Sequence, residues 1–147
     1  MEEKQEDLLE NIAEGQVYTI RTIVISTLLG SLLAGSYMLY QNFKKFGEYK
    51  KARATVMLTI VAFLVLLACA FSPILAKIPG LVYTLVFSII TSLLAQKYQG
   101  DLIEKHIAAN GKIYSAGRAI LICVISVLLL FTLALGAFFM QDMAVNN

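Results

Sequence analysis

Four long apolar runs divide this 147-residue chain, and they constrain its fold more than any other feature. None of the four contains an Asp, Glu, Lys, Arg or His residue. A helix needs about 20 mainly apolar residues to cross the ~30 Å hydrocarbon core of a bilayer, and each run is close to that length. The runs cover residues 22–40, 55–76, 79–96 and 119–140.

Backbone groups inside a bilayer must find hydrogen-bond partners within the protein, which only helices and closed β-barrels achieve. The four runs lack the strict alternation of apolar and polar residues that marks a barrel strand. Charged residues make up only 15% of the chain, against about a quarter in soluble domains. The sequence therefore predicts an all-α fold, an integral membrane four-helix bundle with antiparallel neighbouring spans. Residues 1–147 then form a single transmembrane domain.

The N-terminal segment, residues 1–21, is acidic where a secretory signal peptide would be basic. We expect it to form a tail or a short surface helix ahead of the first span. The two cysteines, Cys69 and Cys123, lie in separate spans and form no CxxC pair. They are therefore expected to act as small apolar filler.

Lys and Arg residues are concentrated in two of the connections. Loop 41–54 contains five of them and loop 97–118 contains four, whereas the two tails and the remaining turn share three. Positive charge near the ends of spans stays in the cytoplasm. We therefore expect both loops to be cytoplasmic and both termini to lie outside, in a cell membrane.

The cations of the first loop have a second possible role besides setting the orientation. Each Lys or Arg near an anionic bilayer surface contributes about 1 kcal/mol of attraction. General attraction to anionic lipid is favoured over recognition of one particular lipid or of nucleic acid. The residues concerned are Lys44, Lys45, Lys50, Lys51 and Arg53.

Small and hydroxyl-bearing residues mark the faces on which the helices should pack. In the first span small residues recur every four positions, which lets another helix approach closely, and packing within the monomer is favoured over homodimerisation. In the third span a row of hydroxyls could line a polar path, but the favoured interpretation is that each bonds back to its own helix. The two sets are Ser26, Gly30, Ala34, Thr27, Ser31 and Gly35, and then Thr84, Ser88, Thr91 and Ser92.

The candidate acid–base residues are Asp101, Glu104 and His106 in the third loop. A catalytic histidine needs an orienting carboxylate and a pocket, and on a helix Asp101 would point well away from His106. We expect all three on a solvated face beside a short amphipathic turn. One histidine and two acids also fall short of a metal site. The sequence contains no phosphate-binding glycine loop, nucleophile elbow or dinucleotide motif, so no catalytic residue, metal, cofactor or nucleic-acid partner is assigned.

The segment GSLLAGSYMLYQNFKKFGEYKKA resembles a recurring pattern in a family of small bacterial membrane proteins of uncharacterised activity. In that pattern a span rich in small residues runs into an Asn-Phe-Lys exit and a basic loop that contains glycine. The Ile78–Pro79 turn and the Asn110–Gly111 element are similar as well. The resemblance implies a four-span protein of the bacterial inner membrane and implies no activity.

Taken together, these features predict a non-enzymatic accessory or scaffold protein that packs with itself or with a larger membrane partner. The alternative is an oligomeric channel or transporter for a small solute, lined by the hydroxyl row of the third span. No span carries the intramembrane carboxylate on which coupled transport usually depends, which argues against a proton-driven pump. A lipid-acting enzyme centred on His106 is the least favoured of the three.

Overall fold

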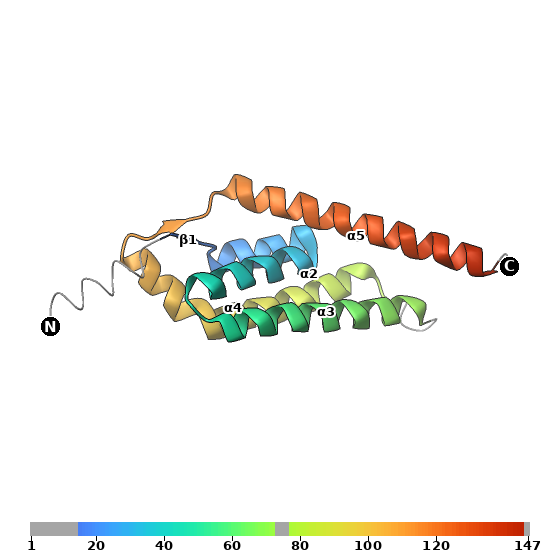
Figure 1. Ribbon diagram of the computed structural model, residues 1–147, viewed down its shortest axis with the longest axis horizontal. Helices are drawn as coiled ribbons and strands as arrows, with labels where there is room; N and C mark the ends of the chain where they lie inside the picture. The colour runs from blue at the N-terminus through green and yellow to red at the C-terminus, as the bar shows by residue number, and fades with distance from the viewer. Residues whose placement is uncertain (1–14, 73–76, 146–147) are drawn as a thin grey trace.

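The computed structural model describes residues 15–72 and 77–145. Four helices in this part of the chain are long and apolar enough to span a membrane, in agreement with the number of spans predicted from the sequence. Most of the acidic N-terminal segment lies outside the described residues. The elements, in chain order, are β1 (Gln16–Val17), α2 (Ile20–Lys45), α3 (Tyr49–Phe71), α4 (Gly80–Ala108), β2 (Lys112–Ile113) and α5 (Ala116–Val145) (Figure 1).

The α2 helix differs most from its prediction, because it consists of two half-helices that fold back on each other (Figure 1). Ser31, between the two halves, has a non-helical backbone with φ 83° and ψ 172°. The amide of Tyr18 donates to Oδ1 of Asn42 at 2.8 Å, and Nδ2 of Asn42 donates to the carbonyl of Tyr18 at 2.8 Å. Along a straight helix these residues would lie about 36 Å apart. The prediction of one continuous span over residues 22–40 is therefore wrong.

Short polar and small side chains stabilise the turn of this hairpin. Ser31 Oγ accepts a hydrogen bond from the amide of Leu33 at 3.3 Å, so it caps the start of the second half-helix. Across the hairpin, Gly35 lies so close to Thr27 that a Cβ would collide with its hydroxyl. At 1.5 Å per residue the two halves are only about 16 and 21 Å long, so the hairpin is shorter than the ~30 Å of a hydrocarbon core.

The hairpin is also the hub of the molecule, because α3, α4 and α5 all pack on α2. Its buried side chains, which include Ile23 and Met38, form one core with Ala95 of α4 and Ala119 of α5. From α4, Gln99 donates through Nε2 to the carbonyl of Leu39 at 2.9 Å and accepts through Oε1 from Asn42 at 3.1 Å. The polar groups that close the hairpin are thus covered by a neighbouring helix.

The α4 helix continues well past the predicted end of the third span. The amphipathic turn that was expected after Gly100 is the last part of this same helix, which ends at Ala108. Asn110 then adopts a positive φ of 58°, and the amide of Gly111 donates to the carbonyl of His106 at 2.8 Å. This turn brings the chain back along the end of α4 and into β2.

The two strands bring the described start of the chain beside the connection between α4 and α5. They pair in parallel, with Gln16 opposite Lys112 and Val17 opposite Ile113. The turn from α2 to α3 lies at this same end of the molecule (Figure 1). We call it the basic end, because it and the adjoining helix turns carry every described Lys and Arg residue except Lys77.

This arrangement corrects the predicted topology. The N-terminal segment was expected at the opposite end from loop 97–118, whereas β1 is hydrogen-bonded to β2 within that loop. The cause is the fold at Ser31, because a segment that reverses direction returns to the end from which it started. For the described residues 15–21, the opposite-end prediction is wrong. The C-terminal part of α5 does extend toward the far end (Figure 1).

The Asn42 side chain should contribute more to stability than its neighbour Gln41. The substitution Asn42→Ala leaves the buried amide and carbonyl of Tyr18 without partners, which costs about 1–3 kcal/mol for each unsatisfied group. We expect a clear loss of thermal stability of the purified protein in detergent. Gln41→Ala, which removes only an exposed hydrogen bond to Tyr37, is the matched control. Equal melting temperatures for the two variants would contradict the hairpin closure described above.

Candidate functional site

The small residues of the first predicted span are divided between the two half-helices of α2. Thr27 faces Gly35 across the hairpin, and its hydroxyl donates to the carbonyl of Ile23 at 2.8 Å. Gly30 lies against Cys123 of α5, where a Cβ would collide with the backbone. Residues expected on one face of a straight helix therefore close the hairpin and bring α5 near. Ser26, Thr27, Gly30, Ala34 and Gly35 are buried, and Ser31 is half-buried.

The hydroxyl row of α4 is divided by burial. Ser88 and Thr91 are buried, and the methyl group of Thr91 lies near the hairpin. Thr84, by contrast, bonds back to a carbonyl of its own helix at 3.2 Å. Ser92 accepts a hydrogen bond from Gln96 at 3.4 Å on the exposed side. The four side chains thus lie in two different environments.

The cations of the first predicted loop gather at the basic end in different surroundings. Lys51 forms an ion pair with Glu48 at 3.0 Å, and its Nζ lies 5.8 Å from the ring centre of Tyr98 on α4. Lys44 extends over the ring of Tyr40, with its Nζ 5.7 Å from the ring centre. Of the remaining three, Lys45 is half-buried, and Lys50 and Arg53 are exposed.

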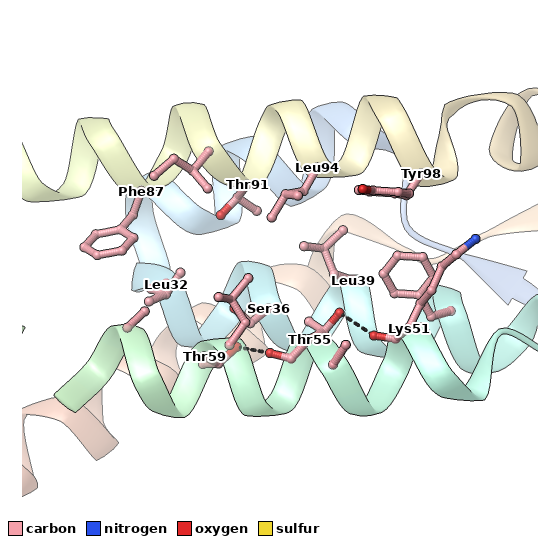
Figure 2. A pocket seen from close by; sticks show the side chains of 15 residues that line it. Leu32, Ser36, Leu39, Lys51, Thr55, Thr59, Phe87, Thr91, Leu94 and Tyr98 are labelled. Carbon is pink, nitrogen blue, oxygen red and sulfur yellow. Dashed lines mark hydrogen bonds between the residues drawn. The ribbon is translucent and has the colours of Figure 1, made fainter. Parts of the chain in front are cut away.

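A groove of about 410 Å³ separates α3 from α4, with the second half-helix of α2 as its floor (Figure 2). Phe87 lies toward one end, and Lys51 and Tyr98 lie together at the other, which is the basic end. We call it the α3–α4 groove. It is lined by Leu32, Ser36, Leu39 and Phe43 of α2, by Lys51, Ala54, Thr55, Leu58, Thr59 and Ala62 of α3, and by Phe87, Ile90, Thr91, Leu94 and Tyr98 of α4.

The wall of the α3–α4 groove is mainly hydrocarbon. The hydroxyl of Thr55 donates to the carbonyl of Lys51 at 2.9 Å, and that of Thr59 donates to the carbonyl of Thr55 at 2.7 Å (Figure 2). Ser36 and Thr91 contribute further hydroxyls from α2 and α4. The lining residues include no carboxylate, histidine or cysteine. This groove is therefore suited to holding an apolar group.

A second cavity, of about 270 Å³, lies at the tip of the α2 hairpin. Thr27 and Ser31 reach it from the hairpin, Thr84 from α4 and Leu130 from α5. It marks the depth at which the hairpin ends, beside Gly80 at the start of α4, while α5 continues further. We call it the tip cavity.

The third-loop residues do not form the solvated set that was expected. His106 is fully buried, whereas Asp101 and Glu104 are exposed. The Nε2 of His106 donates to the carbonyl of Lys112 at 2.9 Å, and the ring meets Phe46 edge-on at 6.5 Å between centres. The prediction of a wet face is wrong for His106, because β2 and the end of α2 cover it. Its described contacts are structural.

An aromatic cluster at the basic end, formed by Tyr18, Tyr114 and Arg118, was not predicted from the sequence. The rings of Tyr18 and Tyr114 lie 4.3 Å apart, and the guanidinium carbon of Arg118 lies 4.1 Å from the centre of the Tyr114 ring. The buried Tyr18 hydroxyl makes no hydrogen bond to the described residues. Burial raises the pKa of this hydroxyl, and the nearby charge of Arg118 opposes the rise. The available signal in the sequence was that Tyr18 and Tyr114 lie just ahead of the first and fourth apolar runs.

Neither a search for metal ligands nor comparison with known proteins indicates a function. Within the described ranges 15–72 and 77–145, no group of three or more His, Cys, Asp or Glu side chains could hold a metal ion. No protein-family model, curated protein or solved structure matches the chain. The function must therefore be argued from the geometry.

His106 should be needed for folding and not for chemistry. His106→Ala removes a fully buried ring and its hydrogen bond to Lys112, and we expect it to lower the free energy of unfolding by about 2–4 kcal/mol. Glu104→Ala, on the exposed side of the same helix, should change it by less than about 0.5 kcal/mol. Denaturant titration of the two variants in detergent checks this. A stable His106→Ala variant would contradict the structural role.

Proposed function

We propose that the protein is a non-enzymatic accessory or scaffold protein of a cell membrane. The length and apolar character of α3, α4 and α5, together with the apolar α2 hairpin, support the membrane location. Two observations support a non-enzymatic role: the one described histidine is buried, and the lining of the α3–α4 groove is mainly apolar and contains no carboxylate, histidine or cysteine. The bacterial inner membrane, implied by the resemblance, remains part of this proposal.

We further propose that α3, α4 and α5 cross the bilayer, while α2 enters and leaves it on the same side. Non-helical backbone at membrane depth is tolerated where protein covers it, as α4 and α5 cover the hairpin. Cations gather at the basic end, which supports a cytoplasmic location for that end. The N-terminal segment is then cytoplasmic and the C-terminal end of α5 lies outside.

The observation that carries the scaffold role is the exposure of the outer part of α5. The contacts of α5 with the hairpin extend from Ala119 to the tip cavity at Leu130. Every side chain in residues 131–136 is exposed. Within this stretch, Thr132 and Gly136 lie four residues apart on one side, and apart from its chain neighbours and its own helix backbone no described atom lies within 4 Å of the position a Gly136 Cβ would occupy. Spacing of small residues by four lets a helix of another chain approach closely.

The corrected topology can be tested by labelling single cysteines at Gln16, Lys112 and Ile78. In a background with Cys69→Ala and Cys123→Ala, an impermeant thiol reagent should label Gln16→Cys and Lys112→Cys only from the cytoplasmic side. Ile78→Cys should be labelled only from outside. The earlier topology groups position 16 with position 78 instead. Labelling of 16 and 78 from the same side would therefore contradict the re-entrant hairpin.

The scaffold role predicts that Gly136→Leu weakens assembly, because the larger side chain prevents close approach of a second helix. We expect about a tenfold loss of complex, equivalent to ~1.4 kcal/mol, measured by native mass spectrometry after mild extraction from membranes. Ala134→Leu is the matched control, since it makes the same kind of change at nearly the same depth on the opposite side of α5.

The composition of the complex then separates the candidate functions. A foreign partner in fixed stoichiometry supports the scaffold. A pure homo-oligomer favours the channel or transporter alternative, and solute flux through liposomes containing the purified protein tests that alternative directly. If Gly136→Leu assembles as well as Ala134→Leu, the outer part of α5 is not an interface.

A further inference from the structure

The α3–α4 groove has the length of one bilayer leaflet. On α4 it extends from Phe87 to Tyr98, and on α3 from Lys51 to Ala62. At 1.5 Å per residue each of these stretches is about 16 Å long, close to half of the ~30 Å hydrocarbon thickness. Its Lys51 end lies at the basic end of the molecule (Figure 2). The groove therefore follows the inner half of the bilayer.

Its volume suits an alkyl chain better than a helix. A helix about 10 Å across fills roughly 420 Å³ in a single 5.4 Å turn, so the 410 Å³ groove accommodates about one turn of a partner helix. A slender chain can instead follow the whole length. The hydroxyls of Thr55 and Thr59 are bonded to their own helix, so the α3 wall does not require a polar partner.

Besides the alkyl chain, the ligand needs an anionic group, because the basic end of the groove carries positive charge. The Nζ of Lys51 lies 5.8 Å from the ring centre of Tyr98, and the Nζ of Lys97 lies 5.5 Å from the same ring. The side chain of Lys51 is 42% exposed, and its described partner is Glu48 at 3.0 Å. The partly exposed ammonium group of Lys51, at the basic end of the groove, complements a phosphate.

We propose that the α3–α4 groove binds one acyl chain of an anionic phospholipid, with the lipid phosphate against Lys51. The inference rests on the membrane location and topology proposed above and is independent of the α5 interface. It differs from general surface attraction because it requires the groove as well as the charge. Bound lipid would cover apolar surface on α3 and α4 that α2 leaves open.

The test uses the full-length protein incorporated into nanodiscs of phosphatidylglycerol and phosphatidylcholine with identical acyl chains. After gentle release, native mass spectrometry counts the lipids retained per protein. We expect one retained phosphatidylglycerol and at least fivefold less phosphatidylcholine. Lys51→Gln should lower phosphatidylglycerol retention about fivefold, as expected for the loss of one cation. Glu48→Gln should raise it, because it removes the competing carboxylate.

Two matched controls distinguish lipid binding in the groove from general attraction to surface charge. Lys50→Gln removes the same charge from an exposed position outside the groove and should leave retention within twofold of wild type. Ala62→Phe fills the groove and should abolish retention, whereas Ala68→Phe adds the same ring on an exposed part of α3 and should not. Thermal unfolding of each variant identifies any that fails to fold, and Lys51→Gln then decides the result.

Three outcomes would overturn the proposal. They are equal retention of the two lipids, equal effects of Lys50→Gln and Lys51→Gln, and unchanged retention in a folded Ala62→Phe variant. Each of these leaves the membrane location intact, because incorporation into nanodiscs and cysteine labelling test that separately. Failure of the protein to enter nanodiscs would instead contradict the membrane location itself.

Discussion

The pair of hydrogen bonds between the backbone of Tyr18 and the side chain of Asn42 underlies the architecture of this protein. The side-chain amide of Asn42, near the end of α2, accepts a hydrogen bond from the backbone amide of Tyr18 and donates one to its carbonyl, just before α2 begins. A helix of 26 residues is thereby closed into a loop whose ends meet. Gln99 extends the same network to α4, so the closure of the hairpin and the seating of a long helix depend on one another.

The hairpin's limited length accounts for the two features on which the functional proposals depend. Because the hairpin ends at the tip cavity, near the start of α4 at Gly80, it packs α3, α4 and α5 together up to that depth and leaves α5 without a hub beyond it. Along the hairpin, α3 and α4 rest on it and leave a groove between them. Beyond the tip cavity, every side chain in residues 131–136 of α5 is exposed. Ser31 adopts a backbone conformation that non-glycine residues rarely occupy, at a typical cost of about 1–3 kcal/mol.

Hydropathy was enough to predict the four apolar segments and the all-helical character, because length and absence of charge are local properties. The hairpin could not be predicted in the same way. Gly30, Ser31 and Gly35 fit a helix-packing face as well as they fit a turn, and what decides between them is a contact between residues 18 and 42. The strands, two residues each, are too short for any periodicity, so the position of residues 16–17 beside residues 112–113 was not predicted.

The candidate sites likewise combine features that local sequence predicts with contacts that only the fold creates. The cations of the first loop were identified by composition, but only the fold brings Lys51 beside Tyr98 of α4. The groove exists because two helices that are adjacent in the sequence both rest on a third, which no local pattern encodes. His106 was misplaced because its cover comes from Phe46 and β2, on other elements, while its own helix turn is amphipathic.

The parallel pairing of β1 with β2 has a consequence for biogenesis. The first of the four apolar segments is held by partners made much later, since Gln16 pairs with Lys112 and Ser26 contacts Cys123. Until those later segments have been synthesised, the bent tip at Ser31 has no cover from α4 or α5. The α2 hairpin is thus made before the segments that hold it, and it can be fixed in place only after β2 and α5 have been synthesised.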